Sequence, residues 1–300
     1  MKKYKIGIDL GGTKIESILL DPAGKEVLTR KRVATPGNVA DRYHAICSAV
    51  CGLVRDTMKA IPDAQDCTVG IGIPGTLSRR TQLVQNANTT CLIGKPFRRH
   101  LAEDLKRPVG MENDANCFTQ AESLSGAAQG YRIVFGVIMG TGCGGGLCID
   151  GRIHHGRHDI AGEWGHFSVD PDGAPCYCGH RGCVETKISG SGVENAFHRR
   201  FGKRLSMQEI VSGHRRGDRE CVEIFEQFLE DFGRCLGGLI SILDPDAVVL
   251  GGGLSAIEEL YGPGLARVRH CAFHQHIETP ILRNRLGDSA GVYGAAWIGL

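Results

Sequence analysis

Short apolar runs separated by a glycine turn open the chain. Lys5-Ile-Gly-Ile-Asp9 and Ile15–Leu20 flank the turn Leu10-Gly-Gly-Thr-Lys14, and Lys25–Val33 supplies a third run. This pattern predicts a β-hairpin followed by a third strand. The apolar positions then adopt helical spacing over residues 41–60, and a last run, Cys67–Ile73, predicts a strand. The predicted order is three strands, a helix and a strand.

The same order starts again near the middle of the chain. Arg132–Met139 predicts a strand, Gly140-Thr-Gly-Cys-Gly-Gly-Gly146 a glycine turn, and Leu147–Asp150 the return strand. The other predicted helices cover residues 97–105, 115–128, 189–201, 207–212, 218–243 and 289–298, and the other strands cover 109–111 and 247–250. Two similar halves are therefore expected in one chain.

Size and charge narrow the class of protein. With 300 residues, we expect two α/β domains: a small one at 1–113, to which a C-terminal helix at about 289–300 returns, and a larger one at 114–288. The 35 Lys and Arg residues nearly balance 33 Asp and Glu residues, so no strong field attracts nucleic acid or a membrane. We therefore expect the protein to bind a small molecule rather than nucleic acid or a membrane.

The N-terminus and the cysteines indicate the compartment. Residues 1–10 carry charges without a following apolar stretch, and no later run approaches the roughly 18 apolar residues of a membrane span, so we expect a cytoplasmic protein. An odd number of cysteines, 13, argues against a disulfide framework there.

Glycine turns between strands bring backbone N–H groups close to an anion, since no Cβ blocks the approach. Asp9, directly before the first turn, is a candidate ligand of hydrated Mg²⁺. Each turn could equally be a plain tight hairpin. A repeated turn and the third cluster, Gly251-Gly-Gly253, favour the phosphate interpretation, although no P-loop motif is present.

These motifs resemble those of the sugar kinase, actin and Hsp70 superfamily. Within it, Glu163-Trp-Gly-His166 followed by Cys176-Tyr-Cys178 and Cys183-Val-Glu185 is similar to the signature of the ROK family (repressor, open reading frame, kinase). The resemblance implies two ribonuclease-H-like domains with ATP, accompanied by Mg²⁺, in the cleft between them. The implied ATP and phosphate residues are Asp9, Gly11, Gly12, Thr13, Lys14, Gly140, Thr141, Gly142, Gly144, Gly251, Gly252 and Gly253.

Asp114 is the candidate acid for chemistry. It follows Asn113 at a predicted strand-to-helix junction, where it could be a helix N-cap or a group that reaches a cleft. The ROK resemblance implies that Asn113 binds sugar and that Asp114 is the general base. A helix N-terminus would keep such a carboxylate ionised, as a base requires.

Three clustered cysteines indicate a metal. Cys176, Cys178 and Cys183, with His166 ten residues before the first, offer four ligands for tetrahedral zinc. Redox chemistry usually uses Cys-x-x-Cys instead, and a packed core would show an apolar pattern. The family resemblance favours zinc at these four residues, and a closed ligand set indicates a structural ion.

The zinc loop carries two acids. By resemblance, Glu163, His166 and Glu185 contact sugar hydroxyls; without the metal ligands, both glutamates would be read as surface acids. Gly75 and Asn88, in Gly72-Ile-Pro-Gly75 and Asn86-Ala-Asn-Thr-Thr90, are the other candidate sugar contacts.

The run Asn86–Phe97 resembles bacterial ROK fructokinases, so the expected reaction is ATP-dependent phosphorylation of D-fructose to fructose 6-phosphate. N-acetylglucosamine kinase, glucokinase and mannokinase of the same family are the alternatives. A non-catalytic sugar sensor is the alternative from another class; a ROK repressor would carry a DNA-binding domain before the first phosphate strand. By resemblance the chain is expected to be a homodimer.

Overall fold

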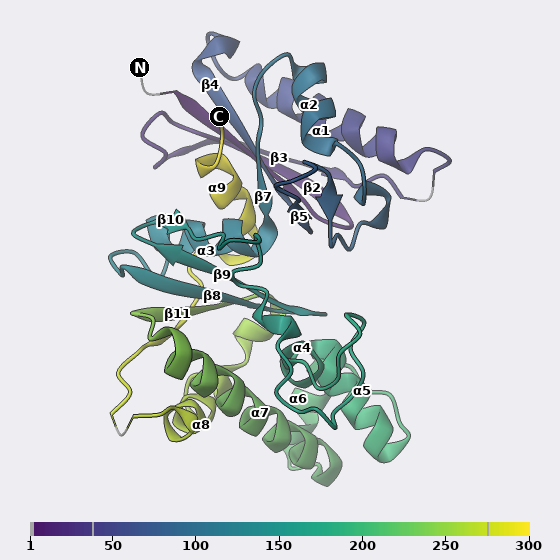
Figure 1. Ribbon diagram of the computed structural model, residues 1–300, viewed down its shortest axis with the longest axis vertical. Coiled ribbons are helices and arrows are strands. Elements are labelled where there is room, and N and C mark those ends of the chain that lie inside the picture. The colour runs from purple at the N-terminus through teal and green to yellow at the C-terminus, as the bar shows by residue number, and fades with distance from the viewer. Residues whose placement is uncertain (1–2, 38, 275) are drawn as a thin grey trace. The chain divides into compact units, whose positions relative to one another are not determined.

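The structure, a computed structural model, describes residues 3–37, 39–274 and 276–300. The chain forms two compact units, which are described separately (Figure 1). Unit 1 comprises Met1–Ala121, His155–Ile160 and Leu286–Leu300, and unit 2 comprises Glu122–His154 and Ala161–Arg285. Unit 1 is thus assembled from three separate stretches of sequence.

A five-stranded mixed sheet forms the centre of unit 1, with the strand order β3-β2-β1-β4-β7. The first three strands are antiparallel, while β4 and β7 run parallel to β1. The strands are β1 (Tyr4–Leu10), β2 (Lys14–Leu20), β3 (Val27–Ala34), β4 (Cys67–Ile73) and β7 (Gly110–Asn113); a small separate hairpin pairs β5 (Thr76–Leu77) with β6 (Val84–Gln85).

Unit 2 repeats this topology, which confirms the repetition expected from the sequence. Its sheet has the order β10-β9-β8-β11-β12, again with three antiparallel strands followed by two parallel ones. The strands are β8 (Ile133–Met139), β9 (Cys143–Ile149), β10 (Arg152–Ile153), β11 (Ala247–Gly251) and β12 (Ile281–Arg283). Both sheets therefore place a glycine turn between their first two strands.

The helices begin at side-chain caps in several places. Asp41, Ser189, Ser206 and Asp218 each accept a backbone hydrogen bond at a helix start. The helices are α1 (Arg42–Met58), α2 (Phe97–Leu105), α3 (Asp114–Ser125), α4 (Val184–Ile188), α5 (Gly190–Phe201), α6 (Met207–Arg216), α7 (Arg219–Leu243), α8 (Pro263–Cys271) and α9 (Ala290–Trp297). None of the described helices has the length and apolar character that crossing a bilayer requires.

The two faces of the unit 1 sheet differ. Ile6, Ile8 and Leu10 of β1 face the core that α1 and α2 cover, whereas the alternate residues face α9. Gly7, Gly70 and Gly110 lie opposite one another on neighbouring strands. A Cβ at any of them would lie within 2.1 Å of a backbone oxygen in or next to α9, so this row of glycines lets the helix approach the sheet closely.

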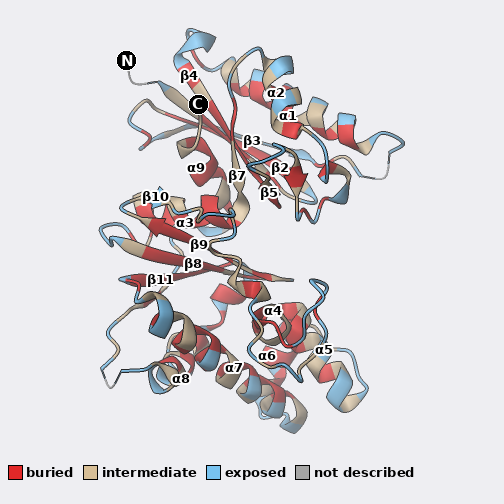
Figure 2. Ribbon diagram, in the orientation of Figure 1, coloured by how far each residue is buried: buried red, intermediate tan, exposed pale blue. Residues whose placement is uncertain are grey.

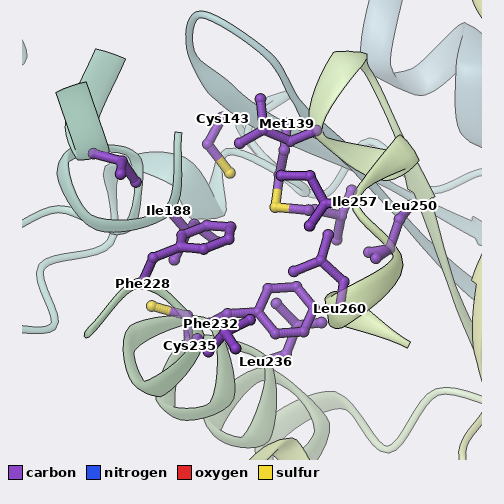
Figure 3. Packing of buried hydrophobic residues seen from close by; sticks show 14 of the residues in the cluster. Met139, Cys143, Ile188, Phe228, Phe232, Cys235, Leu236, Leu250, Ile257 and Leu260 are labelled. Atoms are coloured by element: carbon purple, nitrogen blue, oxygen red, sulfur yellow. The ribbon is translucent and has the colours of Figure 1, made fainter. Parts of the chain in front are cut away.

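The core of unit 2 lies between its sheet and the long helix α7. Phe225, Phe228, Leu229, Phe232 and Leu236 recur at helical spacing and are buried, giving α7 one continuous apolar face. The ribbon of α7 in Figure 2 accordingly alternates between buried and more exposed residues. Figure 3 shows part of this face, with Phe228, Phe232 and Leu236 lying among side chains of β8, β11 and the residues after β11. This packing fixes the sheet that carries the second glycine turn.

The second glycine turn is shorter than expected. The return strand begins at Cys143, so Gly144, Gly145 and Gly146 lie inside β9 rather than in a turn. The reason is a close approach: a Cβ on Gly145 would lie 2.8 Å from Trp164, and one on Gly162 would lie 2.6 Å from the Gly145 oxygen. Small residues are needed here because the segment around Trp164 packs directly on the strand.

Candidate functional site

Three acids of unit 1 lie in one row across the sheet. Strand register aligns Glu16, Asp9, Gly72 and Glu112 on neighbouring strands. Alternation along each strand puts them on the same face. Asp9 and Gly72 each lie one residue before the end of their strand, so the row crosses the sheet at the edge next to the first glycine turn.

Asp9 has the strongest electrostatic perturbation in this row. Burial, reinforced by the nearby charges of Asp114 and Glu16, raises its pKa from 3.8 to about 7, while Lys14 opposes the shift. A Cβ placed on Gly291, at the start of α9, would lie 3.5 Å from this carboxylate. A buried carboxylate whose charge is disfavoured in this way is suited to binding a cation, so Asp9 suits Mg²⁺.

The first glycine turn presents backbone at the surface. Gly12 and Thr13 are exposed, and nothing lies within 4 Å of a Cβ placed on Gly12. The base of the turn is fixed, since the Gly11 N–H donates to the Lys14 oxygen (2.9 Å) and the Thr35 hydroxyl to the Gly11 oxygen (2.7 Å). The turn is rigid at its base and open at its tip, which suits a phosphate contact.

Asn113, and not Asp114, caps α3, which corrects the helix-cap interpretation of Asp114. The helix begins at Asp114, and the Asn113 Oδ1 accepts from the N–H groups of Ala115 (2.9 Å) and Asn116 (3.2 Å). The Ala115 N–H also contacts the Asp114 Oδ1 at 2.8 Å. The capping role is already filled by the residue before Asp114.

The loop after β4 carries the predicted contact Gly75. Its φ is 152°, and a Cβ placed on it would lie 2.8 Å from the Ala87 side chain, so both the backbone and the space require glycine. Asn113 Nδ2 donates to the Gly75 oxygen (3.3 Å), and Asn88 is exposed next to Ala87. Gly75, Asn88 and Asn113 therefore share one region of unit 1.

The glycine motifs of unit 2 border a pocket of about 690 Å³. Gly140, Thr141 and Gly253 line it, together with the start of α5. The N–H of Gly190 donates to the Gly140 oxygen (2.8 Å), which joins that helix start to the turn. The Ser191 N–H donates to the Thr141 oxygen (3.3 Å) and the Gly192 N–H to Ser189 Oγ (3.0 Å), so the first N–H groups of α5 are already used, and what favours a phosphate group here is the positive end of the helix dipole beside a glycine turn.

The other glycines of these motifs support the pocket rather than line it. Gly144 lies in β9 and Gly251 in β11, while a Cβ on Gly142 would lie 2.6 Å from the Glu185 carboxylate. Gly252 has a φ of 76°, and a Cβ there would meet the Met139 oxygen at 2.3 Å. The chain can follow this path only with glycine at 252.

The four predicted metal ligands lie together in unit 2. The ligand atoms of His166, Cys176, Cys178 and Cys183 are all within 4.8 Å of one another. His166 Nδ1 is 3.6 Å from the Cys176 sulfur, and the sulfurs of Cys178 and Cys183 are also 3.6 Å apart. A zinc tetrahedron with bonds of about 2.3 Å to sulfur has edges of about 3.8 Å. Three thiols and an imidazole nitrogen at this spacing fit zinc.

Glycines make the tight turns of this zinc loop possible. Gly179 has a φ of 95° and Gly182 a φ of 57°, and a Cβ on Gly182 would overlap the Asp170 oxygen at 1.7 Å. Lys187 Nζ donates to Asp170 at 2.6 Å, which anchors the loop to α4. The predicted metal ligands thus lie on a backbone that glycine turns and an ion pair hold in place.

Glu163 and Glu185 lie near each other beside the zinc loop. Burial raises the pKa of Glu163, with His166 opposing and Glu185 reinforcing the shift. The Cys143 N–H donates to Glu185 Oε2 at 3.0 Å, so this acid also contacts the base of the second glycine turn. Unit 2 therefore groups the predicted sugar acids, the predicted metal ligands and the second of the predicted phosphate turns.

Sequence reasoning missed several residues of these sites. Ser191 and Glu194 on α5 line the large pocket, but their residue types are too common on helices to signal it. Glu112 and His155 form a hydrogen bond of 2.5 Å beside Asn113. They are 43 residues apart, and only the position of Glu112 next to Asn113 could have drawn attention to it.

Comparison with known proteins identifies the class that this fold and these sites define. The ROK family model matches residues 5–300. The N-acetyl-D-glucosamine kinase of Pectobacterium atrosepticum is 36% identical over 307 residues, covering 98% of each chain. The chain is a sugar kinase by class, and it belongs to the ROK family.

Solved structures agree with this assignment. The ROK hexokinase of Thermus thermophilus is 32% identical with a TM-score of 0.88, covering 99% of this chain and 97% of that one. A ROK family glucokinase from Streptomyces griseus, in complex with glucose and AMPPNP, is 29% identical with a TM-score of 0.78 and 99% coverage of both chains. These matches confirm the predicted fold class, and the family implies ATP and Mg²⁺ as cosubstrate and ion.

Proposed function

We propose that this protein transfers the γ-phosphoryl group of ATP to the 6-hydroxyl of N-acetyl-D-glucosamine. The sugar kinases to which the chain is similar favour this alternative over D-fructose, because the curated relative described above acts on that sugar by name. The single observation that carries the chemistry is the junction of β7 and α3. There the cap is supplied by Asn113, and Asp114 lies close enough to Asp9 to perturb it.

Asp114 is the proposed general base. A carboxylate near the accepting hydroxyl takes its proton as the phosphoryl group arrives, and much of its value is in orienting that hydroxyl. Asn113 orients the sugar through its side chain while its Oδ1 caps the helix. The same residue pair therefore combines recognition with proton transfer.

The phosphates are held by backbone and neutralised by cations in this proposal. The turns at Gly11–Thr13 and Gly140–Gly142 use the N–H groups of Gly11 and Gly140 internally, and they offer the N–H groups of the remaining residues, such as Gly12, where no Cβ blocks the approach. Magnesium, when bound with ATP, spreads and neutralises the charge that develops on the transferred group. Asp9 holds the hydrated ion through its carboxylate, whose raised pKa falls when a cation replaces its proton.

Glu163, His166 and Glu185 are the proposed sugar contacts of unit 2. A carboxylate accepts hydrogen bonds from two adjacent hydroxyls, so two fixed glutamates select a particular arrangement of hydroxyls. Zinc held by His166, Cys176, Cys178 and Cys183 would be structural, since four protein ligands leave no position for substrate. Its role is to fix the loop that carries these acids.

A substrate panel tests the proposal. We would compare kcat/KM for N-acetylglucosamine, fructose, glucose, mannose and N-acetylmannosamine with ATP and Mg²⁺. N-acetylglucosamine is expected to exceed the others by at least about tenfold, the range that differences in pocket contacts supply. A higher kcat/KM for fructose would restore the substrate expected from the sequence; no turnover with any sugar would contradict the kinase function.

Replacement of the base tests the mechanism. Asp114→Asn keeps the size of the side chain, so the variant should fold and bind sugar while kcat falls by about 10²- to 10⁴-fold. A coupled assay of ADP release measures the rate, and calorimetric titration measures sugar binding. A near-normal kcat would remove Asp114 from the role of base.

A further inference from the structure

Glu112 and His155 form a polar network that contacts Asn113, the residue before the proposed base Asp114. His155 Nε2 lies 2.5 Å from Glu112 Oε2. The other carboxylate oxygen, Oε1, accepts from the Asn113 backbone N–H (2.8 Å) and from Asn116 Nδ2 (3.0 Å). Both oxygens of Glu112 are therefore used, one by His155 and one by the start of α3.

The network continues to the loop after β4. Asn113 uses its backbone N–H for Glu112, its Oδ1 for the cap of α3, and its Nδ2 for the Gly75 oxygen (3.3 Å). A displacement of Glu112 would therefore move Asn113, and with it the contact to Gly75. Asp114 follows Asn113 in the chain and would shift with it.

Electrostatics strengthen the Glu112–His155 contact. The Glu112 side chain is only 12% exposed, and burial alone would disfavour its charge, but hydrogen bonds from His155, Asn116 and Asn113 outweigh burial and lower its pKa. The hydrogen bond to Glu112 in turn raises the pKa of His155. Charge-assisted hydrogen bonds of this kind are shorter and stronger than neutral ones.

A second ion pair fixes the segment that carries His155. Residues 155–160 belong to unit 1, although the residues on both sides of them belong to unit 2. At the far end of the segment, Arg79 Nε lies 2.6 Å from Asp159, whose side chain is 13% exposed. Two charge pairs, Glu112–His155 and Arg79–Asp159, therefore hold the segment against unit 1.

We propose that His155 is a positioning residue for the phosphoryl transfer: by anchoring Glu112, it fixes Asn113 and Asp114 in the geometry that sugar binding and proton transfer need. The inference rests on the proposed function of Asn113 and Asp114. His155 itself touches neither sugar nor phosphate in this role. Displacements of about 1 Å at reacting groups cost up to about a hundredfold in rate, so a lost anchor has a measurable effect.

Three variants test the proposal. His155→Ala removes the anchor, His155→Gln keeps a side-chain N–H that can donate to Glu112, and His158→Ala removes an exposed histidine of the same segment. We expect His155→Ala to raise the KM for sugar and lower kcat by about tenfold or more, with the KM for ATP within about twofold. His155→Gln should recover most of this loss, and His158→Ala should match the wild type.

Two measurements separate this inference from the proposed function. Calorimetric titration with N-acetylglucosamine reports sugar affinity without turnover, and thermal unfolding reports stability. If the wild type binds and phosphorylates the sugar, and His155→Ala has the same sugar affinity and the same kcat and KM, then the positioning role is overturned and the proposed function is not. The positioning role would also be overturned if His155→Ala raised the KM for sugar and the KM for ATP equally and lowered the Tm, and if His155→Gln did not reverse these changes. Such a result would indicate general destabilisation. Absence of sugar binding and turnover in the wild type would overturn the proposed function and the inference with it.

Discussion

Asp9 combines burial with two neighbouring acids, so its charge is costly in the absence of a cation. Glu16 lies opposite Asp9 on the adjacent strand and contacts Arg30 (3.3 Å) and Arg32 (3.0 Å), so its own charge is balanced. For Asp9 the opposing charge of Lys14 is outweighed by burial and by the two neighbouring acids, and its pKa rises to about 7. Residues that bind ions often carry such a penalty in the free protein, since the ion supplies the missing charge.

Asp9→Asn should therefore stabilise the free protein and inactivate it. The pKa of Asp9 is 3.8 in the unfolded state and about 7 in the folded state, so the folded state binds the proton more tightly. The free energy of unfolding of the wild type therefore falls as pH rises from about 4 to 7. At pH 8 the substitution removes the full penalty and should raise the free energy of unfolding by on the order of 2–4 kcal/mol. At pH 5 the gain should be smaller.

Urea unfolding at both pH values, with and without Mg·ATP, measures this difference. Mg·ATP should stabilise the wild type more than the variant, which narrows the gap. Asp66→Asn, at an exposed acid of the same unit, is the control and should change little at either pH. If Asp9→Asn has the same stability as the wild type at pH 8, the charge of Asp9 is not a source of strain.

Among the structural elements, the zinc loop, which carries His166, Cys176, Cys178 and Cys183, has little regular structure of its own, and a zinc ion held by these four residues would fix it. Cys178 is exposed, so replacing it leaves the apolar core intact. Cys178→Ser should lower zinc content and weaken sugar binding together, because Glu163 and Glu185 flank the ligands. We expect metal affinity to fall by at least about 10- to 100-fold, because that is the loss caused by replacing groups that only orient the ligands, and Cys178 is a proposed ligand itself.

Metal analysis and calorimetric titration with N-acetylglucosamine test the two effects on one preparation. Cys91→Ser, which replaces a half-buried cysteine outside the zinc loop, is the matched control and should keep both properties. Loss of zinc with unchanged sugar affinity and stability would show that the loop does not shape the sugar site.

Elements with strong local patterns were predictable from the sequence. The strand Cys67–Ile73 and the helix Phe97–Leu105 have the predicted bounds, since an unbroken apolar run and a helical spacing mark them. The cluster of His166 with three cysteines was predictable from spacing and resemblance. In each case the necessary information lies within a few residues.

Elements and contacts that depend on distant partners were not predictable. Strand β12 has three residues and exists through its parallel pairing with β11, while helix α8 begins at a proline after a loop and was missed. Gly144–Gly146 were predicted as turn because glycine weakens strands, but the approach of Trp164 makes glycine necessary there. The Glu112–His155 pair likewise depends on tertiary folding alone.

For the molecule as a whole, the two ends of the chain meet in unit 1. Residues 286–300 return to the first sheet, and α9 lies on the row formed by Gly7, Gly70 and Gly110. Gly291 at the start of the same helix lies beside the Asp9 carboxylate. The final segment of sequence therefore completes the sheet packing that also positions the proposed Mg²⁺ ligand.

Gly70→Ala tests this closure. A Cβ at Gly70 would lie 1.9 Å from the Ala295 oxygen, so α9 must move away from the central strand β4. Overpacking of this kind costs about 1–3 kcal/mol or more in the free energy of unfolding. We expect a lower Tm together with a raised KM for ATP, because Asp9 loses the neighbouring helix start.

Gly52→Ala is the matched control within unit 1. Gly52 is an exposed residue of α1 with nothing within 4 Å of an added Cβ, so alanine should stabilise the protein by about 0.5–1 kcal/mol. Thermal unfolding and ATP kinetics measure both effects, and a Gly70→Ala variant with wild-type Tm would show that α9 does not depend on this close contact.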